Sequence, residues 1–579
     1  MSRRFNLIVL LGVAVHFAFA QTVVPPVRAG FAASVWVGNV TTTGATVALR
    51  LTTSGERVRL IVSPNATPTL AVFSDIGTTA AASGNALKLS VQGLVPDTDY
   101  FYSIEVNGVV RTEANSRGRF HTFPVGKASF KIAFGGDSHW TDGGMSTFDE
   151  ILATKPLLFI HMGDLHYNDT NTPNPDDYRS NFDNVLNQPN EAALYRNVPL
   201  AYMWDDHDFC GNNSDGTFLG RDTARAVYKE RVPHYPLATN AGGTIAQSFT
   251  VGRVRVIMTD LRSAADPEFK LDNASKTHLG AAQKAWFKQE LLDAHNAGFP
   301  LILWVCTNPW IGPLTPGQDS DNWTGFQTER TEIANFIKVN HISNVVLLSA
   351  DMHALAYDDG THSDYATGGG APLIVLHAAA LTQGGTIKGG PYTVGPIQGS
   401  FQYGLLEVFD NGGPSVACRF QGVKAAQGVL MSYSFSTANV PPNTVQALVN
   451  ISTLARVTSS TDTIISGFVI AGSAPRTVLM RAVGPTLALF GLTDALATPQ
   501  LFVFRGGTVI GSNTGWASNA DTASQLTAAF DRTGAFRLVD SSSRDSALLL
   551  TLDPGAYTIQ VKSATNAIGA ALLEVYDDP

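Results

Sequence analysis

The fold is decided by the stretch Leu157-Leu158-Phe159-Ile160-His161-Met162-Gly163-Asp164-Leu165-His166-Tyr167. Its apolar start predicts a strand that is buried on both faces, and a cluster of His and Asp follows that strand directly. The same pattern recurs at further apolar runs, each of which ends in polar residues: Phe130–Phe134, Leu200–Trp204, Val254–Met258, Leu301–Val305 and Val345–Leu348. Because ligands bind beyond the carboxyl ends of strands in open α/β sheets, we expect these polar groups to meet in one site.

Helical patterns separate several of these runs. The segment His278–Ala294 places Trp286 and Leu291 on one apolar stripe, and a second helix is predicted over Glu329–Val339. A seventh apolar run lies at Leu373–Leu376. Buried strands that alternate with helices indicate a sheet covered on its faces, so the central block is predicted to be α/β.

The segments on either side of this block are β-like. The stretch Leu94-Val95-Pro96-Asp97-Thr98-Asp99-Tyr100-Phe101-Tyr102 resembles the tyrosine corner of an immunoglobulin-like sandwich, and the segment around it resembles a fibronectin type III module. We expect this module to be a structural spacer. Near the C-terminus, Leu552-Asp553-Pro554-Gly555-Ala556-Tyr557 predicts a turn followed by a strand, and the surrounding residues are predicted to form an all-β domain without chemistry.

The composition excludes several classes of protein. The chain has 579 residues, of which 44% are hydrophobic and 15% are charged, and its formal net charge is -9. This hydrophobic content excludes a chain that is disordered throughout. The negative net charge gives no sign of the basic surface that a nucleic-acid-binding protein would need. Cys210, Cys306 and Cys418 match no zinc or haem motif and permit at most one internal disulfide. We expect Cys210 and Cys306 to be buried core thiols.

The first twenty residues are typical of an export signal. Arg3 and Arg4 form a basic start, Leu7–Val15 is apolar, and Ala18-Phe19-Ala20 supplies the small residues that a signal peptidase recognises. The apolar run is too short to span a bilayer, and no later stretch reaches about 18 apolar residues without charges, so no transmembrane segment is predicted. We expect an exported bacterial protein, secreted or periplasmic.

Many carboxylates at one sheet edge require a counter-charge. Like charges in a shared cleft repel and raise one another's pKa, and a bound divalent or trivalent cation removes that cost. Two cations that share a carboxylate suit phosphate ester cleavage, because they polarise the phosphoryl group, activate a bound water and stabilise the leaving oxygen. The competing idea is a serine nucleophile elbow, but no Gly-x-Ser-x-Gly is followed by a convincing acid and His in the α/β-hydrolase order.

Four motifs occur in order along the central block: Asp137-x-His139, Gly163-Asp164, Asp206-His207-Asp208 and Asp351-x-His353. Together they resemble the signature of the calcineurin-like metallophosphoesterases. Further motifs bring the chain closest to the alkaline phosphatase D (PhoD-like) branch: Trp204–Asp208, Thr259–Ser263, Leu279-Gly280-x-x-Gln283-x-x-Trp286 and Ser349–His353. The resemblance implies a metallophosphatase-type layered αββα core behind an N-terminal β-sandwich. It also implies hydrolysis of phosphate esters by attack of a metal-bound hydroxide.

The sequence patterns, together with the resemblance, give the predicted domain boundaries. They are residues 1–20 for the signal peptide, 27–124 for the fibronectin type III-like β-sandwich, 128–436 for the metallophosphoesterase catalytic domain, 437–450 for a linker and 451–579 for a C-terminal β-rich accessory domain.

The resemblance also implies two metal positions. The first would use Asp137, His139, Asp164 and His353, while Tyr167 is either a further ligand, which favours ferric iron, or an aromatic wall of the cleft. The second would share Asp164 and add Asp206, Asn308 and Asp351. His207 would be the acid or transition-state stabiliser, oriented by a carboxylate such as Asp208.

The chain departs from the family pattern at several of these positions. Asp206 stands where the superfamily has Asn, and Asn308 and Asp351 stand where it has His. The second position is therefore all oxygen, which suits Ca²⁺, Mg²⁺ or Mn²⁺, whereas Fe³⁺ or Zn²⁺ is expected at the His/Tyr position. The first strand ends in Gly135-Gly136-Asp137, where PhoD-like proteins often place a Cys ligand, so iron–thiolate chemistry is in doubt.

The resemblance implies that the substrate is a phosphate mono- or diester, small or polymeric, and the candidate binding residues are Arg262, Asn212, His166 and His377. Arg262 either clamps a phosphate or forms an ion pair with Asp260 or another acid. The absence of a Lys/Arg cluster near the motifs favours diesters. The alternative function is a non-catalytic surface or polymer-binding protein on a decayed metallophosphatase scaffold, with the C-terminal domain in contact with a cell surface.

Overall fold

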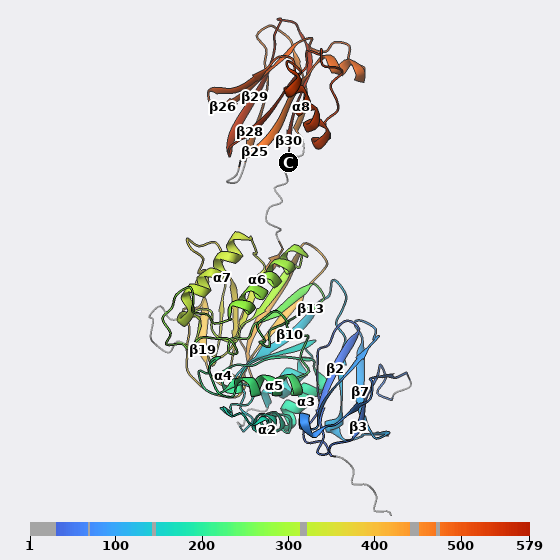
Figure 1. Ribbon diagram of the computed structural model, residues 1–579, viewed down its shortest axis with the longest axis vertical. Helices are drawn as coiled ribbons and strands as arrows, with labels where there is room; N and C mark the ends of the chain where they lie inside the picture. The colour runs from blue at the N-terminus through green and yellow to red at the C-terminus, as the bar shows by residue number, and fades with distance from the viewer. Residues whose placement is uncertain are drawn as a thin grey trace, which may run out of the picture. The chain divides into compact units, whose positions relative to one another are not determined.

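The computed structural model describes residues 30–67, 70–141, 146–312, 321–439, 451–470 and 475–578. The chain divides into two compact units, Met1–Pro441 and Pro442–Pro579 (Figure 1). The predicted signal peptide and most of the predicted linker lie outside the described residues. Among the described helices, none is long and apolar enough to cross a membrane.

The first of two large sheets in the first unit is centred on parallel strands. They are β10 (Phe130–Gly135), β11 (Leu158–Met162) and β12 (Leu200–Met203), each parallel to the next. The sheet order is β22-β21-β20-β10-β11-β12-β1-β2-β6. Its other strands are β1 (Trp36–Gly38), β2 (Gly44–Arg50), β6 (Ala86–Gln92), β20 (Gln402–Phe409), β21 (Ser415–Lys424) and β22 (Gly428–Ala438).

The second large sheet has the order β13-β14-β15-β16-β18-β17-β19. Strands β14 to β16 and β18 are parallel neighbours. The bounds are β13 (Gln247–Val251), β14 (Val254–Met258), β15 (Leu301–Val305), β16 (Val345–Ser349), β17 (Ala354–Asp358), β18 (Ile374–Ala378) and β19 (Val394–Gln398). Each of the seven apolar runs in the sequence is thus confirmed as a strand.

Alternate residues of these strands face two different cores. In β15, Leu303 and Val305 pack in a core that also contains Ile160 of the first sheet, so the two sheets pack face to face. Ile302 and Trp304 point the other way, into a separate core. This double burial is why the sequence shows unbroken apolar runs instead of alternation.

Helices build the outer side of the second core. Helices α6 (Ala281–Asn296) and α7 (Gln327–Val339) place Phe287 and Ile333 in the same core as Trp304, so they cover the second sheet (Figure 1). The predicted helices over His278–Ala294 and Glu329–Val339 are confirmed, with small shifts of their starts. Gly280, with φ 76°, delays the start of α6.

Other helices accompany the first sheet. They are α1 (Ser146–Ala153), α2 (Pro175–Leu186), α3 (Pro189–Asn197) and α5 (Arg221–Arg231). Phe148 and Leu194, from α1 and α3, pack in the core shared with the strands of that sheet. Helix α2 begins after Asn174, whose side chain accepts a hydrogen bond from the Asp176 N–H at 3.2 Å.

The N-terminal β-region is built into the core of the first unit. Strand β1 pairs in parallel with β12 through Gly38 and Leu200, so β1, β2 and β6 extend the first sheet. A Cβ at Gly38 would lie 2.7 Å from the Leu200 carbonyl oxygen, which explains the glycine. The Trp36 Nε1–H also donates to the Arg231 carbonyl oxygen at 3.1 Å. The region is therefore part of the core, and the expectation of a spacer is corrected.

A separate N-terminal sheet completes this region. Its strands are β3 (Arg57–Ser63), β4 (Val72–Phe73), β5 (Gly77–Thr78), β7 (Asp99–Val106), β8 (Val109–Val110) and β9 (Arg117–His121). The Tyr100 hydroxyl accepts a hydrogen bond from the Val95 N–H at 2.9 Å, which is the contact that the tyrosine-corner pattern predicts.

The second unit contains two further sheets. One has the order β23-β30-β25-β28 and the other β24-β29-β26-β27. The bounds are β23 (Ile451–Val457), β24 (Ile464–Ile470), β25 (Arg476–Val483), β26 (Pro499–Arg505), β27 (Thr508–Asn513), β28 (Ser546–Leu552), β29 (Gly555–Ser563) and β30 (Gly569–Asp577). The expectation of an all-β domain is wrong, because helix α8 (Ala520–Thr533) is present, capped by Asn519 and burying Leu526 and Phe530.

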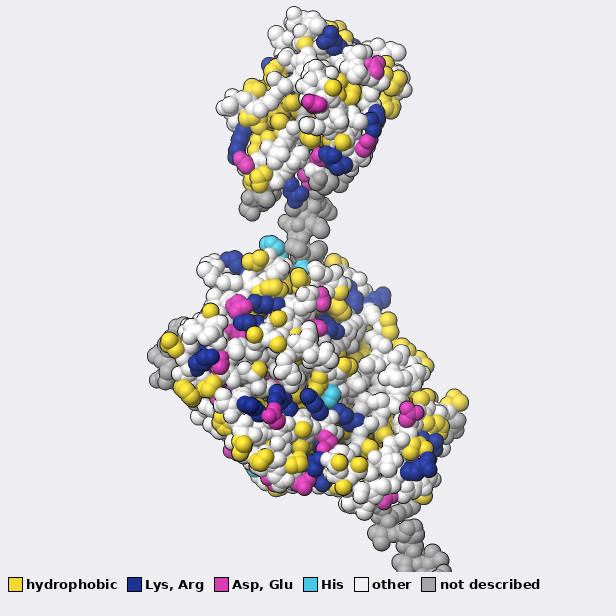
Figure 2. All heavy atoms as spheres, in the orientation of Figure 1, with side chains coloured by type: hydrophobic (Ala, Val, Ile, Leu, Met, Phe, Trp, Pro, Cys, Tyr) yellow, Lys and Arg dark blue, Asp and Glu magenta, His cyan; other side chains and the backbone are white. Residues whose placement is uncertain are grey.

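Cys210, Cys306 and Cys418 are all buried, free thiols. Figure 2 shows the low charged content as scattered blue and magenta side chains on a surface that is mostly uncharged.

Candidate metal centre

Acidic residues leave both large sheets at their carboxyl ends. In the first sheet, Asp137 follows β10, Asp164 follows β11, and Asp206 opens the short helix α4 (Asp206–Phe209) beyond β12. In the second sheet, Asp351 follows β16. The Asp351 N–H donates to Asp137 Oδ2 at 3.1 Å, so the loops of the two sheets meet. The structure therefore brings together side chains that are far apart in sequence.

Three of these aspartates have a left-handed backbone conformation. The φ angles are 63° at Asp137, 55° at Asp164 and 68° at Asp351. Asp is one of the few residues besides Gly that adopts this region, at a cost of roughly 1–2 kcal/mol per residue. Strained backbone of this kind clusters at functional sites, because the surrounding structure holds it in place.

A phenol, an imidazole and a carboxylate meet at the first position. The Tyr167 hydroxyl lies 3.0 Å from His353 Nε2 and 3.3 Å from Asp137 Oδ1. His353 Nδ1 lies 2.7 Å from the Gln383 carbonyl oxygen, to which it can only donate. In the neutral imidazole the proton is thus on Nδ1, and Nε2 keeps its lone pair toward the cluster.

His139 lies beside this group. Its ring contacts that of Tyr167 edge-on, with 6.2 Å between ring centroids, and its Nδ1 lies 2.5 Å from Thr141 Oγ1. The His139 N–H donates to Thr382 Oγ1 at 2.7 Å, which fixes the loop after β10. The predicted ligand is thus placed next to the predicted first position.

The carboxylates form a continuous acidic cluster. In each of three groups, the possible ligand atoms lie within 4.8 Å of one another: Asp137 with Asp164 and Asp351, Asp164 with Asp206 and His207, and Asp205 with Asp206 and Asp351. Asp164, Asp206 and Asp351 each belong to two groups, so the groups are connected. Asp205 is a member that sequence reasoning did not select.

Burial and mutual repulsion act on this cluster. Burial, followed by the neighbouring carboxylates, raises the pKa of Asp164 well above its usual range. Burial likewise raises the pKa of Asp351 well above its usual range. Burial raises the pKa of Asp205 to about 8, although the charge of Arg262 opposes the shift. Burial and then the surrounding carboxylates also raise the pKa of Tyr167.

A cation fits this set of residues. Asp164 Oδ1 accepts a hydrogen bond from the His207 N–H at 3.3 Å, but Asp164 Oδ2 is buried with no hydrogen-bond partner among the described residues. An unpartnered buried carboxylate oxygen is costly, and a metal ion would satisfy it. Carboxylates, one phenol and imidazole nitrogen are also the donors that protein-bound Fe³⁺, Zn²⁺ and hard divalent cations take.

Asn308 is placed beside the cluster, but its amide is turned. The Asn308 Nδ2 donates to Asp205 Oδ2 and to Asp351 Oδ2, each at 3.3 Å. Its Oδ1 lies 3.1 Å from His278 Nε2. In this arrangement Asn308 presents N–H groups to the carboxylates, and the oxygen predicted as a metal ligand faces His278.

The Arg262 guanidinium forms ion pairs with carboxylates of the protein and is not free to bind a phosphate. Its side chain is 3% exposed, its Nε pairs with Asp205, and its Nη1 donates to Asp321 Oδ1 at 2.8 Å. Arg262 contacts Asp260 through its backbone N–H, which donates to Asp260 Oδ1 at 3.0 Å, and not through its guanidinium. The phosphate-clamp prediction is therefore corrected in favour of the ion-pair alternative, with Asp205 and Asp321 as the partners.

Two other predicted substrate ligands are core residues. His377 is buried between Ser349 Oγ, 2.8 Å from Nδ1, and the Met352 carbonyl oxygen, 2.8 Å from Nε2. His166 is also buried, with Nε2 3.5 Å from Asp208 Oδ1. Both predictions are corrected, because neither imidazole is accessible to a substrate. Asn212, by contrast, is exposed.

The predicted partner of His207 is also corrected. Asp208 accepts from the backbone N–H groups of Leu165 at 2.8 Å and His166 at 3.1 Å, so it holds the loop after β11. His207 Nδ1 instead lies 2.5 Å from Asp169 Oδ1. The His207 ring stacks on Tyr167 with 4.0 Å between centroids. These contacts leave Nε2 as the nitrogen available to a substrate.

The sequence patterns gave no individual role to four residues of this network: Asp169, Asp205, Asp321 and Lys388. Asp205 was visible inside the Trp204–Asp208 motif, but its position one residue before Asp206 gave it no separate role. Lys388 stands in a glycine-rich stretch, which is a loop pattern without chemical content. Asp169 and His207 are 38 residues apart in sequence, so only the fold reveals their contact.

The pKa shifts predict how the metal-free protein responds to pH. The carboxyls of Asp164, Asp351 and Asp205 keep their protons to higher pH in the folded state than in the unfolded state. The folded state therefore binds more protons, and stability is expected to fall as pH rises from about 6.5 to about 8. Buried histidines such as His377, with a pKa lowered by burial to about 4, titrate below this window.

Calorimetric melting of chelator-treated protein across this pH range measures the effect. Adding Ca²⁺ together with Zn²⁺ is expected to flatten the profile, because bound cations replace the protons that neutralise the cluster. A melting temperature that stays constant or rises with pH in the metal-free protein would contradict the assigned shifts.

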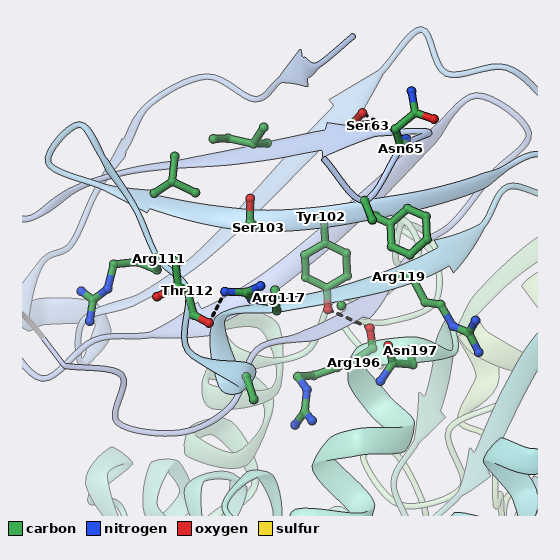
Figure 3. Close-up of a pocket in the computed structure, with 16 residues that line it drawn as sticks. Ser63, Asn65, Tyr102, Ser103, Arg111, Thr112, Arg117, Arg119, Arg196 and Asn197 are labelled. Atoms are coloured by element: carbon green, nitrogen blue, oxygen red, sulfur yellow. Dashed lines mark hydrogen bonds between the residues drawn. The ribbon is translucent and has the colours of Figure 1, made fainter. Parts of the chain in front are cut away.

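A hollow in the N-terminal sheet is separate from this cluster. It measures about 450 Å³ and is lined in part by Arg111, Arg117, Arg119 and Arg196. Figure 3 shows the guanidinium groups spread around the hollow and pointing in different directions, so they do not converge on one ligand position. The Tyr102 hydroxyl donates to the Arg196 carbonyl oxygen at 3.0 Å, which ties this sheet to the end of α3.

Comparisons with known proteins agree with this geometry. Residues 132–389 match the sequence model of the family described as PhoD-like phosphatase. Alkaline phosphatase D of Bacillus subtilis (strain 168) is 22% identical over 326 residues, which cover 48% of this chain and 55% of that protein. The chain thus spans about half the length of this curated relative.

Two solved structures share the fold. One described as the structure of PhoD has a TM-score of 0.58 and 18% identity, over 71% of this chain and 91% of that chain. A purple acid phosphatase from yellow lupin (Lupinus luteus) seeds has a TM-score of 0.51 and 13% identity, over 69% and 74% of the two chains. The fold is therefore that of the metallophosphatases. Within that class, residues 132–389 belong to the PhoD-like branch.

Proposed function

We propose that this protein is an exported, metal-dependent phosphoesterase that hydrolyses phosphate mono- or diesters. The observation that carries the proposal is the buried carboxylate cluster between the two sheets, in which Asp164 Oδ2 has no partner among the described residues. The family match supports a phosphate ester as the substrate.

Two metal positions follow from the donor set. The first would be held by Asp137, His139, Asp164, Tyr167 and His353, and the second by Asp164, Asp206, Asp351 and Asn308 after rotation of its amide. We propose Fe³⁺ or Zn²⁺ at the first and Ca²⁺, Mg²⁺ or Mn²⁺ at the second. Cations held there supply Lewis-acid polarisation of the phosphoryl group and activation of the attacking water.

His207 is proposed as the proton donor to the leaving oxygen. Its contact with Asp169 fixes the ring, and stacking on Tyr167 limits its rotation. Asp169 is thereby a positioning residue, in the place that the sequence had suggested for Asp208. The protonated imidazole is the form that donates to a leaving group.

The remaining regions extend the proposal. The N-terminal region is proposed as a fibronectin type III-like sandwich that braces the layered αββα core through β1. The second unit is proposed as an accessory domain that contacts a cell surface, and residues 1–20 as the signal peptide of a secreted or periplasmic bacterial protein.

Metal removal tests the proposal directly. The purified protein is expected to contain bound metal by mass spectrometry and to hydrolyse p-nitrophenyl phosphate, bis-p-nitrophenyl phosphate or both. Chelation should abolish turnover, and reconstitution with iron or zinc plus calcium or manganese should restore it. No metal and no turnover after reconstitution would instead favour the non-catalytic binding protein.

A further inference from the structure

A glycine-rich segment, Gln383–Gly390, here called the strap, contacts the candidate metal centre, because the Gln383 N–H donates to the Asp137 carbonyl oxygen at 3.1 Å. A Cβ at Gly385 would lie 2.5 Å from the ring of His353, so the strap packs directly on that imidazole. A Cβ at Gly389 would lie 2.4 Å from the Ile311 carbonyl oxygen, which also accepts from the Gly390 N–H at 3.1 Å. Glycines at both ends therefore permit a close approach that holds the strap in place.

The strap aims one lysine at the second metal position. Lys388 Nζ lies 2.7 Å from Asp351 Oδ1 and 3.4 Å from Asp321 Oδ2, and the side chain is 12% exposed. The Lys388 carbonyl oxygen accepts from Asn322 Nδ2 at 3.0 Å, which fixes the backbone from which the side chain extends. The ammonium is thus placed by the fold against a predicted metal ligand.

The two metal positions differ in how their charge is balanced. At the second position, Asp351 meets Lys388 at one oxygen and Asn308 Nδ2 at the other. At the first position, no Lys or Arg of the described residues pairs with Asp137 or Asp164. A cation is therefore needed at the first position, whereas the second already contains a protein cation.

We propose that Lys388 is a built-in competitor for the second cation, so that this position is loaded reversibly and sets the activity by the free concentration of a hard divalent ion. The inference rests on the proposed function. Lysine suits the role because its single charge sits on a flexible stem that can withdraw when an ion binds. Arg262 Nη2 lies 3.7 Å from Asp206 Oδ1 of the same position, but Arg262 cannot withdraw, since its planar group is held by Asp205 and Asp321.

Calcium titration of the full protein tests this competition. With zinc loaded at the first position, Lys388→Gln is expected to bind Ca²⁺ at least about tenfold more tightly than the wild type by calorimetry, because a nearby positive charge has been removed. Lys388→Arg, which keeps the charge, is expected to remain close to the wild type. Lys270→Gln is the matched control, since Lys270 pairs at 2.8 Å with Asp266, which is outside the cluster.

The outcomes separate this inference from the proposed function. Unchanged or weaker Ca²⁺ binding in Lys388→Gln would overturn the inference while zinc binding and hydrolysis still support a phosphoesterase. A wild type that binds neither ion would overturn both. Lys388→Met, which preserves the length of the stem, replaces Lys388→Gln if that variant does not fold, and the same tightening is expected.

Discussion

An Asp164→Asn variant is expected to have its activity reduced by more than about 100-fold. Mutating a residue that only supports a metal ligand typically costs about 10- to 100-fold, and Asp164 is proposed as a ligand itself. The same variant is expected to melt at a higher temperature than the wild type when both are metal-free. Asp164 is buried among other carboxylates, and its raised pKa shows that its charge is disfavoured in the folded state. The amide keeps the shape and removes that charge, so stability rises as function is lost.

The measurements are metal content, turnover of a p-nitrophenyl ester, and melting temperature after chelation. Asp410→Asn is the matched control, because Asp410 is also buried but pairs at 2.5 Å with Arg253, outside the cluster. That variant is expected to melt at a lower temperature and to keep its metal and its activity. A metal-free Asp164→Asn protein that melts below the wild type would contradict the electrostatic argument.

Replacing His207 with alanine is expected to lower kcat/KM by about 100- to 10,000-fold with metal content unchanged. The loss should be larger for phenyl phosphate than for p-nitrophenyl phosphate, because the more basic leaving oxygen depends more on a proton donor. His362→Ala is the matched control, since His362 forms a similar pair with Asp358 at 2.7 Å away from the acidic cluster. Equal losses for both esters would show that His207 does not act as the acid.

An Asp169→Asn variant extends this test to the positioning residue. It keeps a side chain within reach of His207 Nδ1 but removes the carboxylate that orients the ring. We expect a loss of activity smaller than that of the His207 variant, with metal content unchanged. Asp208→Asn, in contrast, is expected to act through the fold, because Asp208 holds the backbone of Leu165 and His166.

The central fold could be predicted because its strands are buried on both faces. Runs such as Leu301–Val305 are apolar at every position, and the structure shows why: Leu303 faces one core and Trp304 the other. Continuous burial leaves a direct trace in sequence. The N-terminal strands have a weaker sequence pattern. That pattern did not predict that β1 pairs with β12, in which Gly38 and Leu200 are 162 residues apart.

The acidic cluster could be predicted because local chain geometry places it. Asp137 and Asp164 follow neighbouring parallel strands of the first sheet, and Asp351 follows a parallel strand of the second. Within each sheet, parallel strands bring their carboxyl ends to one edge. The partners of individual side chains could not be predicted in this way. Arg262 and His377 have residue types that suit a phosphate site, yet both are buried in contacts with distant parts of the chain.

The sequence by itself determined the layered α/β class, the strand ends that carry the chemistry, and the family, because these depend on residue type and order along the chain. The tertiary structure decided that Asp169 rather than Asp208 meets His207, that Arg262 is an internal counter-ion, and that Lys388 reaches Asp351. Charge pairing depends on distances in space between loops from different strands. Those distances are set by how the two sheets pack against each other, so they cannot be read from the spacing of residues along the sequence.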